Sequence, residues 1–238
     1  MSDYLLFRLY GPLAAWGDIA VGEYRPSFAH PSKSAIVGLL AAALGIRRHE
    51  EERQQALAGA ISFAVQVDAM GVLLRDYHTT QVPSARQGIT NYTRRSELSA
   101  DDLNTILSTR DYRSDAVHTV AITLAKESVF TVSSLVTALK RPVFTLYLGR
   151  KSCPPALPLQ PQVVTAATLK EAMQKAEFIN AELTTITDTI DFHLYWEDNI
   201  TSGFERTQVI SRRDTPRSRK RWQFSDRREN YCAIQKEG

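Results

Sequence analysis

The chain has 238 residues, of which 23% are charged and 43% hydrophobic, the composition of an ordinary folded protein with one elaborated domain or two small ones. It has no apolar stretch of the roughly 20 residues that a membrane-spanning helix needs, no secretory pattern at the N-terminus, and two cysteines too far apart in sequence to form a metal or disulfide motif. We therefore expect a protein of the cytoplasm with two free thiols and no membrane contact.

The net charge of +3 is unevenly distributed. The segment 206–228 contains nine basic and two acidic residues, hence a charge of +7, so the rest of the chain carries −4. A mildly acidic body with one strongly basic segment favours a polyanionic partner for that segment. A solvated charged tail without a partner is the alternative.

The first 150 residues predict alternating strands and helices. Strands are expected at 4–10, 61–68, 72–82, 117–124 and 142–148, and helices at 33–44 and 131–140. The second and third strands are expected to pair as a hairpin around Met70-Gly71. The resulting order, β-α-β-β-(insertion)-β-α-β, is that of a ferredoxin-like α+β domain with a long excursion after its third strand.

The excursion, residues 83–115, is polar and has no strong apolar period, so we expect it to project from the body. Four prolines between residues 153 and 161 predict a stiff connector. One helix and two strands are expected beyond it, at 168–178, 190–196 and 204–211. We therefore divide the chain into a domain of residues 1–150 and a smaller β-rich region of residues 151–238.

Signatures of most enzyme classes are missing from the sequence. Neither Gly-rich nucleotide-binding loop occurs, the five histidines form no metal-ligating pattern, and there is no nucleophile elbow. These absences weaken most enzyme classes without excluding any, and we expect no cofactor, no metal and no catalytic residue.

Two short segments have the residues that bind phosphate. Lys33 and Ser34 open the first predicted helix, where backbone N–H groups, a hydroxyl and an ammonium converge. After the last strand of the first domain, a glycine precedes Arg150, Lys151 and Ser152, and allows close approach of the backbone to RNA. A plain helix cap and a charged turn are the respective alternatives.

The projecting segment is a third candidate RNA-binding site. Arginines interleaved with tyrosines stack on splayed bases while pairing with phosphates. A disordered polar loop is the alternative. The best candidates in the segment are Arg94, Arg95, Arg110, Tyr112 and Arg113.

Several motifs resemble a known family. The most specific are Y-L-L-F-R-L-Y-G-P-L-A-A-W-G at 4–17 and L-G-R-K-S-C-P at 148–154. R-P-S-F-A-H-P-S-K-S-A-I-V-G-L-L-A-A-A-L-G-I at 25–46 and T-R-D-Y-R-S-D-A at 109–116 are also similar. Together with the basic ending, they resemble the CasD family of the repeat-associated RNA-binding (RAMP) superfamily.

The resemblance implies an RRM-related, ferredoxin-like domain with a β-hairpin thumb at about 78–116. It also implies a non-catalytic subunit of a type I-E CRISPR Cascade complex, which caps the 5′ handle of the guide RNA (crRNA). The implied protein partners are the first backbone subunit and the large subunit that reads the protospacer-adjacent motif. Arg212 and Arg213 would contact the RNA backbone or face the large subunit, and the basic segment could touch target DNA near the motif.

Two other functions stay open. The related subunit of type I-C systems cleaves precursor RNA without metal through a Tyr, Lys and His set, and Tyr24, His30 and Lys33 could imitate it here. The third hypothesis is a protein-interaction scaffold whose basic segment binds an acidic partner.

Overall fold

The computed structural model describes residues 1–84, 90–179, 183–187 and 191–235. Its centre is a seven-stranded sheet in the order β10-β11-β9-β4-β7-β1-β8, in which neighbouring strands are antiparallel. The strands are β1 (Ser2–Tyr10), β4 (Ile61–Ala69), β7 (Val117–Leu124), β8 (Gln162–Ala166), β9 (Asp191–Trp196), β10 (Gln208–Ser218) and β11 (Gln223–Gln235). The expected α+β class is thus confirmed.

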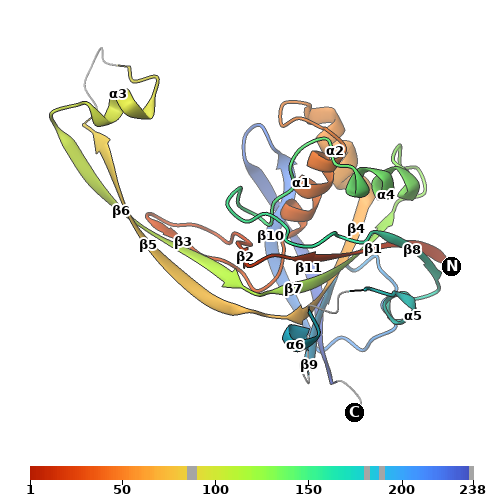
Figure 1. The fold of residues 1–238 in the computed structure, drawn as a ribbon. Helices are drawn as coiled ribbons and strands as arrows, with labels where there is room; N and C mark the ends of the chain where they lie inside the picture. The colour runs from red at the N-terminus through yellow and green to blue at the C-terminus, as the bar shows by residue number, and fades with distance from the viewer. Residues whose placement is uncertain (85–89, 180–182, 188–190, 236–238) are drawn as a thin grey trace.

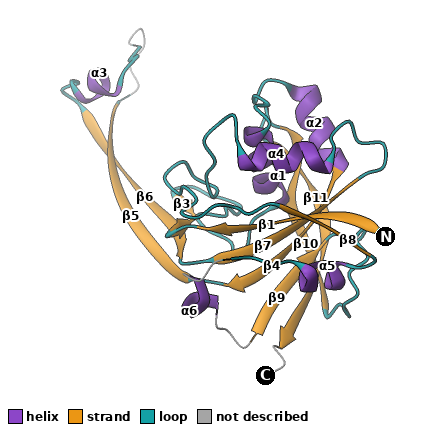
Figure 2. Ribbon diagram, turned by 45° about the vertical axis from the view of Figure 1, so that its right-hand side comes forward, coloured by secondary structure: helices purple, strands orange, loops and turns teal. Residues whose placement is uncertain are grey.

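Helices cover both faces of this sheet (Figures 1 and 2). They are α1 (Lys33–Ala43), α2 (Glu51–Ala60), α4 (Val132–Lys140), α5 (Leu169–Lys175) and α6 (Thr184–Thr187). Because successive side chains of a strand point to opposite faces, β1 contributes to two cores. Leu5, Phe7 and Leu9 pack in the core that contains α1 and α4, whereas Tyr4 and Leu6 pack in the core that contains α5.

The first predicted helix is confirmed together with its end signals. Ser32 is the N-cap, because its hydroxyl accepts a hydrogen bond from the Ala35 N–H at 3.1 Å. Gly45 follows the helix with a φ of +72°, the left-handed conformation that glycine adopts easily. Seven of the eleven residues of α1 are buried, as its nearly encircling apolar residues predicted.

Two long strands leave the body as a hairpin (Figure 1). β5 (Val72–Pro83) and β6 (Leu103–Ser114) pair along their full length, and α3 (Arg94–Leu98) lies at the far end. Near the body, two short strands, β2 (Leu13–Ala14) and β3 (Tyr24–Arg25), pair with β6. We call residues 72–114 the arm. The excursion expected from the sequence therefore projects, but its regular part begins at Val72 rather than at residue 83.

The predicted pairing of the second and third strands is wrong. β4 lies between β7 and β9 in the sheet, and β5 pairs with β6. Side chains on both faces of β4 are buried, which suits a central strand, whereas most of β5 is exposed. Gly71, with a φ of +67°, marks the point where the chain leaves the sheet for the arm.

The strand predicted at 142–148 is also wrong. The backbone N–H groups of Val143 and Phe144 donate to the carbonyl oxygens of Ala43 and Ala42, so this segment satisfies the last turn of α1 instead. The place beside β1 is taken by β8, which follows the proline-rich connector. Helix α2 was not predicted from the sequence, and the strand predicted at 204–211 ends before the basic residues of β10.

The division of the chain at residue 150 stays a prediction. Within the described ranges, no helix has the combined length and apolar character that crossing a bilayer requires.

Candidate nucleic-acid interface

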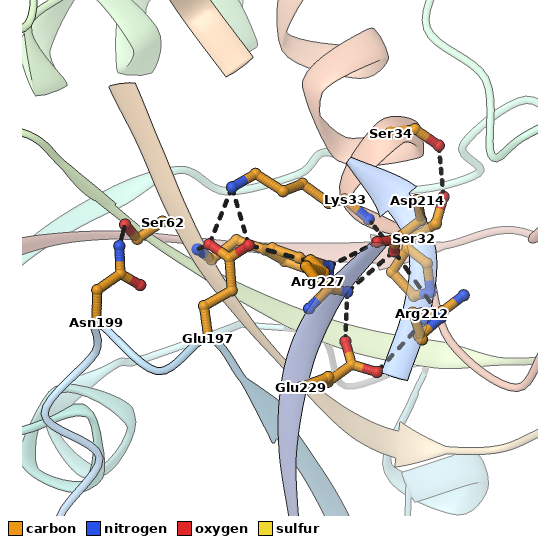
Figure 3. Close-up of polar contacts among 12 residues, drawn as sticks. Ser32, Lys33, Ser34, Ser62, Glu197, Asn199, Arg212, Asp214, Arg227 and Glu229 are labelled. Atoms are coloured by element: carbon orange, nitrogen blue, oxygen red, sulfur yellow. Dashed lines mark hydrogen bonds and ion pairs between the residues drawn. The ribbon is translucent and has the colours of Figure 1, made fainter. Parts of the chain in front are cut away.

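The first predicted phosphate site, at the start of α1, is filled by carboxylates of the protein itself (Figure 3). Lys33 Nζ donates to both carboxylate oxygens of Glu197, at 2.8 and 3.1 Å. The Lys33 backbone N–H donates to Asp214 at 2.9 Å, so a side chain supplies the anion that a helix N-terminus favours. Because Lys33 and Glu197 are both buried, Lys33 serves the fold rather than the predicted phosphate. Ser34, in contrast, lines two surface hollows.

Lys33 belongs to a buried ionic network that joins α1 to the hairpin β10–β11. Arg227 donates to Asp214 at 2.6 and 2.9 Å and lies 2.5 Å from a Glu229 oxygen. Burial opposes the ionisation of Glu229, but His30 and the nearby arginines lower its pKa to about 2. The network contains three cations and three carboxylates, a balance that buried charges require. They are Lys33, Arg212 and Arg227, with Glu197, Asp214 and Glu229.

Arg212 is part of this buried network, and its side chain is only 8% exposed. Its guanidinium lies 4.0 Å from the centre of the Phe28 ring, and Arg212 Nη1 is 3.6 Å from a Glu229 oxygen. Side chains alternate along β10, so Arg212 points inward and its neighbour Arg213 is exposed. Of the two arginines predicted to reach RNA or a partner subunit, only Arg213 is therefore accessible.

The three residues of the possible cleavage set are each engaged elsewhere. His30 is fully buried and stacked on Tyr195, with ring centres 3.8 Å apart, and burial lowers its pKa. The Tyr24 hydroxyl donates to Asp111 at 2.5 Å, and Lys33 is paired as described above. A base and an acid must both reach the substrate, so this geometry does not support the endoribonuclease alternative.

Arg150 joins the second predicted site to the base of the arm. Its guanidinium donates to the carbonyl oxygens of Asp111 and Arg25, at 3.1 and 3.2 Å, and lies 4.7 Å from the centre of the Tyr112 ring. Tyr112 is buried beneath it, so this ring does not offer a face to a base. Gly149 has a φ of +86°, and a Cβ there would lie 1.9 Å from a backbone carbonyl oxygen. The loop therefore needs glycine at that position.

The other predicted contacts are divided between two places. In the loop beside Arg150, Lys151 and Ser152 are exposed. The part of β6 near the body carries Arg110 and Arg113. Arg94 and Arg95 lie at the tip, in α3, and Arg94 donates to Glu97 at 2.8 Å. The structure thus gathers the loop and the base of the arm, and it leaves the tip distant from both (Figure 1).

A basic surface that was not predicted from the sequence lies on the turn between β10 and β11. Two hollows of ≈ 790 and ≈ 600 Å³ meet there, and a third of ≈ 290 Å³ extends toward Gly149 and Arg150. Trp222 lines all three. We call this surface the turn groove. Four exposed cations lie on it beside the exposed Trp222: Arg213, Arg217, Lys220 and Arg221. The sequence signal was Arg-Lys-Arg-Trp at 219–222, an aromatic residue that follows three cations.

Across the described part of the chain, no group of three or more His, Cys, Asp or Glu side chains is arranged to hold a metal ion.

Comparisons with known proteins place this architecture in a family. A family model described as "CRISPR-associated protein (Cas_Cas5)" matches residues 4–229. The chain is 34% identical to the "CRISPR system Cascade subunit CasD" of Escherichia coli K12 over 206 residues, which cover 82% of this chain and 86% of that protein.

Solved structures show the same fold. A chain of a "CRISPR RNA-guided surveillance complex" superposes with a TM-score of 0.68 at 25% identity, covering 98% of this chain and 90% of its own. A second, described as "Crystal structure of Cas protein", has a TM-score of 0.64 at 28% identity and covers 98% and 95%. Sequence and fold thus agree over nearly the whole length, and the chain belongs to the Cas5 family of CRISPR-associated proteins.

Proposed function

We propose that this protein is the CasD subunit of a type I-E Cascade complex, and that it holds the 5′ handle of the crRNA without cleaving it. Its relative in E. coli is named as a Cascade subunit, and a similar solved chain comes from an RNA-guided surveillance complex. An RNA-guided complex of this kind acts in antiviral defence or RNA-guided DNA targeting in the cytoplasm. The complex reads sequence by base pairing, so the protein subunits mainly hold backbone and shape.

The observation that carries this proposal is the row of adjoining hollows from the arm base to the turn groove, which arginines and Trp222 line. The ≈ 290 Å³ hollow is lined by Ser34, Gly149, Arg150 and Arg219, and it meets the larger hollows at Trp222. Lys151 is exposed next to this hollow, directly after Arg150 in the loop that Gly149 begins. Positive charge with an exposed aromatic ring is typical of surfaces that bind single-stranded nucleic acid.

The arm fits the thumb of the family. In the sheet, β8-β1-β7-β4 has the order and antiparallel pairing of a ferredoxin-like domain, and the arm is inserted between β4 and β7. Exposed apolar residues along the arm, such as Leu73, Leu74 and Tyr77, suit protein contacts. We assign these to the backbone subunit, and the basic turn to the RNA, the large subunit or target DNA near the motif.

The absence of catalysis is part of the proposal. The cleavage set suggested by the sequence is engaged within the fold, with His30 buried and Lys33 bound to Glu197. A ribonuclease that acts through the 2′-hydroxyl needs an accessible base and acid.

The test is binding of the purified chain to a labelled RNA that bears the host's 5′ handle, against a scrambled RNA of equal length. The assay is run in EDTA at about physiological salt, because phosphate binding depends strongly on salt, and the samples are then resolved on a denaturing gel. We expect preference for the handle and intact RNA. Cleavage at one position contradicts the non-catalytic role, and equal binding to both RNAs contradicts handle recognition by this chain.

Charge-reversal variants locate the surface. Lys151→Glu should weaken handle binding. Because at least one phosphate contact is lost, the slope of log K against log salt concentration should also become shallower by about 0.7. Lys126→Glu is the matched control, because Lys126 is exposed beyond the end of β7 that lies away from the arm. Equal effects of the two variants would contradict this location.

A further inference from the structure

The exposed ring of Trp222 is unusual for its position in the fold. Trp222 lies in the turn before β11 and is 57% exposed. The other two tryptophans, Trp16 and Trp196, are buried. Its φ of +53° lies in the left-handed region that bulky residues rarely adopt. Such backbone conformations persist where the surroundings hold them, and they gather at functional sites.

The surroundings do hold this turn. Arg48 Nε donates to the Arg219 carbonyl oxygen at 2.9 Å, and Arg219 in turn donates to the carbonyl oxygen of Ser34, at the start of α1. From α2, the Gln55 side chain donates to the carbonyl oxygen of Arg217. The turn is thus tied to α1, to α2 and to the loop between them. A ring held in this way loses little conformational freedom when a ligand binds.

The Trp222 ring already has partners within the protein. The Arg48 and Arg219 guanidinium groups lie 4.3 and 6.0 Å from the ring centre, both in cation–π contact, and Phe224 is 6.2 Å away at a tilt of 34°. Since Trp222 also lines the three hollows of the turn groove, its exposed surface faces open space. A flat aromatic ligand could therefore stack on it.

The charges in the ≈ 790 Å³ hollow beside this ring favour phosphate. The ≈ 790 Å³ hollow has four cations, Arg213, Arg217, Lys220 and Arg221, and one acid, Glu51. An acidic peptide would satisfy these cations, but it would leave the ring and its Arg48 partner without a role. A nucleotide uses both, because each base has a flat face and each phosphate a negative charge.

We propose that Trp222 is a stacking platform for one unpaired base of the bound RNA, with the four cations of the turn groove on the flanking phosphates. This inference rests on the proposed function, because it takes the 5′ handle as the ligand. The site is sequence-tolerant by its chemistry, since stacking uses the face of a base and not its edge. It therefore adds affinity and fixes register, while other contacts supply any sequence preference.

The test combines variants of the full-length protein with single abasic sites in the handle RNA. Trp222→Ala should weaken handle binding on the order of tenfold, and Trp222→Tyr should recover most of it. One abasic position should weaken wild-type binding by a similar factor, and the same position should cause no further loss in Trp222→Ala. Val129→Ala, at a residue that is 81% exposed, is the control and should bind as wild type.

Fluorescence supplies a second readout. Because the other two tryptophans are buried, quenching by bound RNA should come from Trp222 and be absent in Trp222→Ala. The salt dependence should stay unchanged in Trp222→Ala and fall in Arg217→Ala, because only the second variant loses a phosphate contact.

Several outcomes separate this inference from the proposed function. Wild-type affinity of Trp222→Ala, with no abasic position coupled to it, overturns the platform and leaves handle binding intact. Equal quenching by poly-glutamate and by RNA also overturns it, because the groove would then be a site for acidic protein. Failure of the wild-type chain to bind the handle at all removes the proposed function itself.

Discussion

Replacing Glu197 by glutamine would leave the Lys33 ammonium buried without its counter-charge. In the native protein, the ammonium is 2.8 and 3.1 Å from the two Glu197 oxygens, and the side chains of the pair are 11% and 9% exposed. Removing one partner of a buried ion pair costs about 3–5 kcal/mol, because the remaining charge stays desolvated. We therefore expect Glu197→Gln to lower the free energy of unfolding by about that amount.

Replacing Lys33 by methionine should lower the free energy of unfolding less than Glu197→Gln does. In Lys33→Met, Glu197 keeps the Phe63 backbone N–H at 3.1 Å and Arg227 at 3.9 Å, so its charge remains compensated. The loss of charged hydrogen bonds then costs about 2 kcal/mol. The double variant has no unpaired ammonium, so it should be less destabilised than Glu197→Gln alone.

Urea unfolding at constant m-value measures these differences, and RNA binding is measured on the folded variants. Additive losses in the double variant would refute the reasoning, because two independent sites add and a buried pair does not. Native stability of Lys33→Met together with weakened RNA binding would also refute it. That result would put the ammonium on the RNA, as the sequence alone predicted.

Three further predictions concern the loop, a histidine and the thiols. Gly149→Ala should destabilise the protein by about 2 kcal/mol or more in urea unfolding, because of its φ and the 1.9 Å approach of a Cβ to backbone oxygen. Gly59→Ala, in α2 with open space around the site, should stabilise by about 0.5–1 kcal/mol, and a neutral Gly149→Ala would contradict the loop geometry. Burial lowers the pKa of His118 from 6.5 to about 3, so the unfolded chain takes up a proton below pH 6.5 that the folded chain does not. Stability should therefore fall as the pH drops through that window, by about 2 kcal/mol at pH 5 from this group, and His118→Gln should remove that part of the pH dependence. An unchanged slope in the variant would contradict the buried neutral imidazole. Burial raises the pKa of the Cys153 thiol, and that of Cys232 to about 11, so iodoacetamide at pH 7.5 should label neither in the native protein and both in urea, as read by mass spectrometry. Rapid labelling of the native chain would contradict their burial.

Elements with strong local signals were predictable from the sequence. α1 has a serine cap, an apolar surface nearly all round and a terminal glycine, and α4 begins with a capping box at Thr131 and Ser134. β1, β7 and β9 are short apolar or alternating runs. Pairing was not predictable in the same way, since the choice between β5 and β7 as the neighbour of β4 depends on which faces become buried.

In the candidate site, too, local residue types were predictable from the sequence, whereas contacts between distant parts of the chain were not. The residue types of the predicted contacts suited RNA, but Lys33 has its partners 164 and 181 residues away, in Glu197 and Asp214. No local pattern indicates a counter-charge at that separation. The basic segment was recognised as a whole, yet strand alternation separates Arg212, which is buried, from Arg213, which is exposed. That distinction required knowing that β10 extends to Ser218.

The central claim is that the handle lies on the surface between the arm base and the turn groove. The direct measurement is photo-crosslinking of a handle RNA with 4-thiouridine at successive positions, in the complex assembled with the other Cascade subunits, followed by mapping of the linked peptides. We predict links to the loop 149–152, to the base of the arm and to the turn 219–222. Links confined to the opposite face of the sheet, which carries α5, would contradict the account.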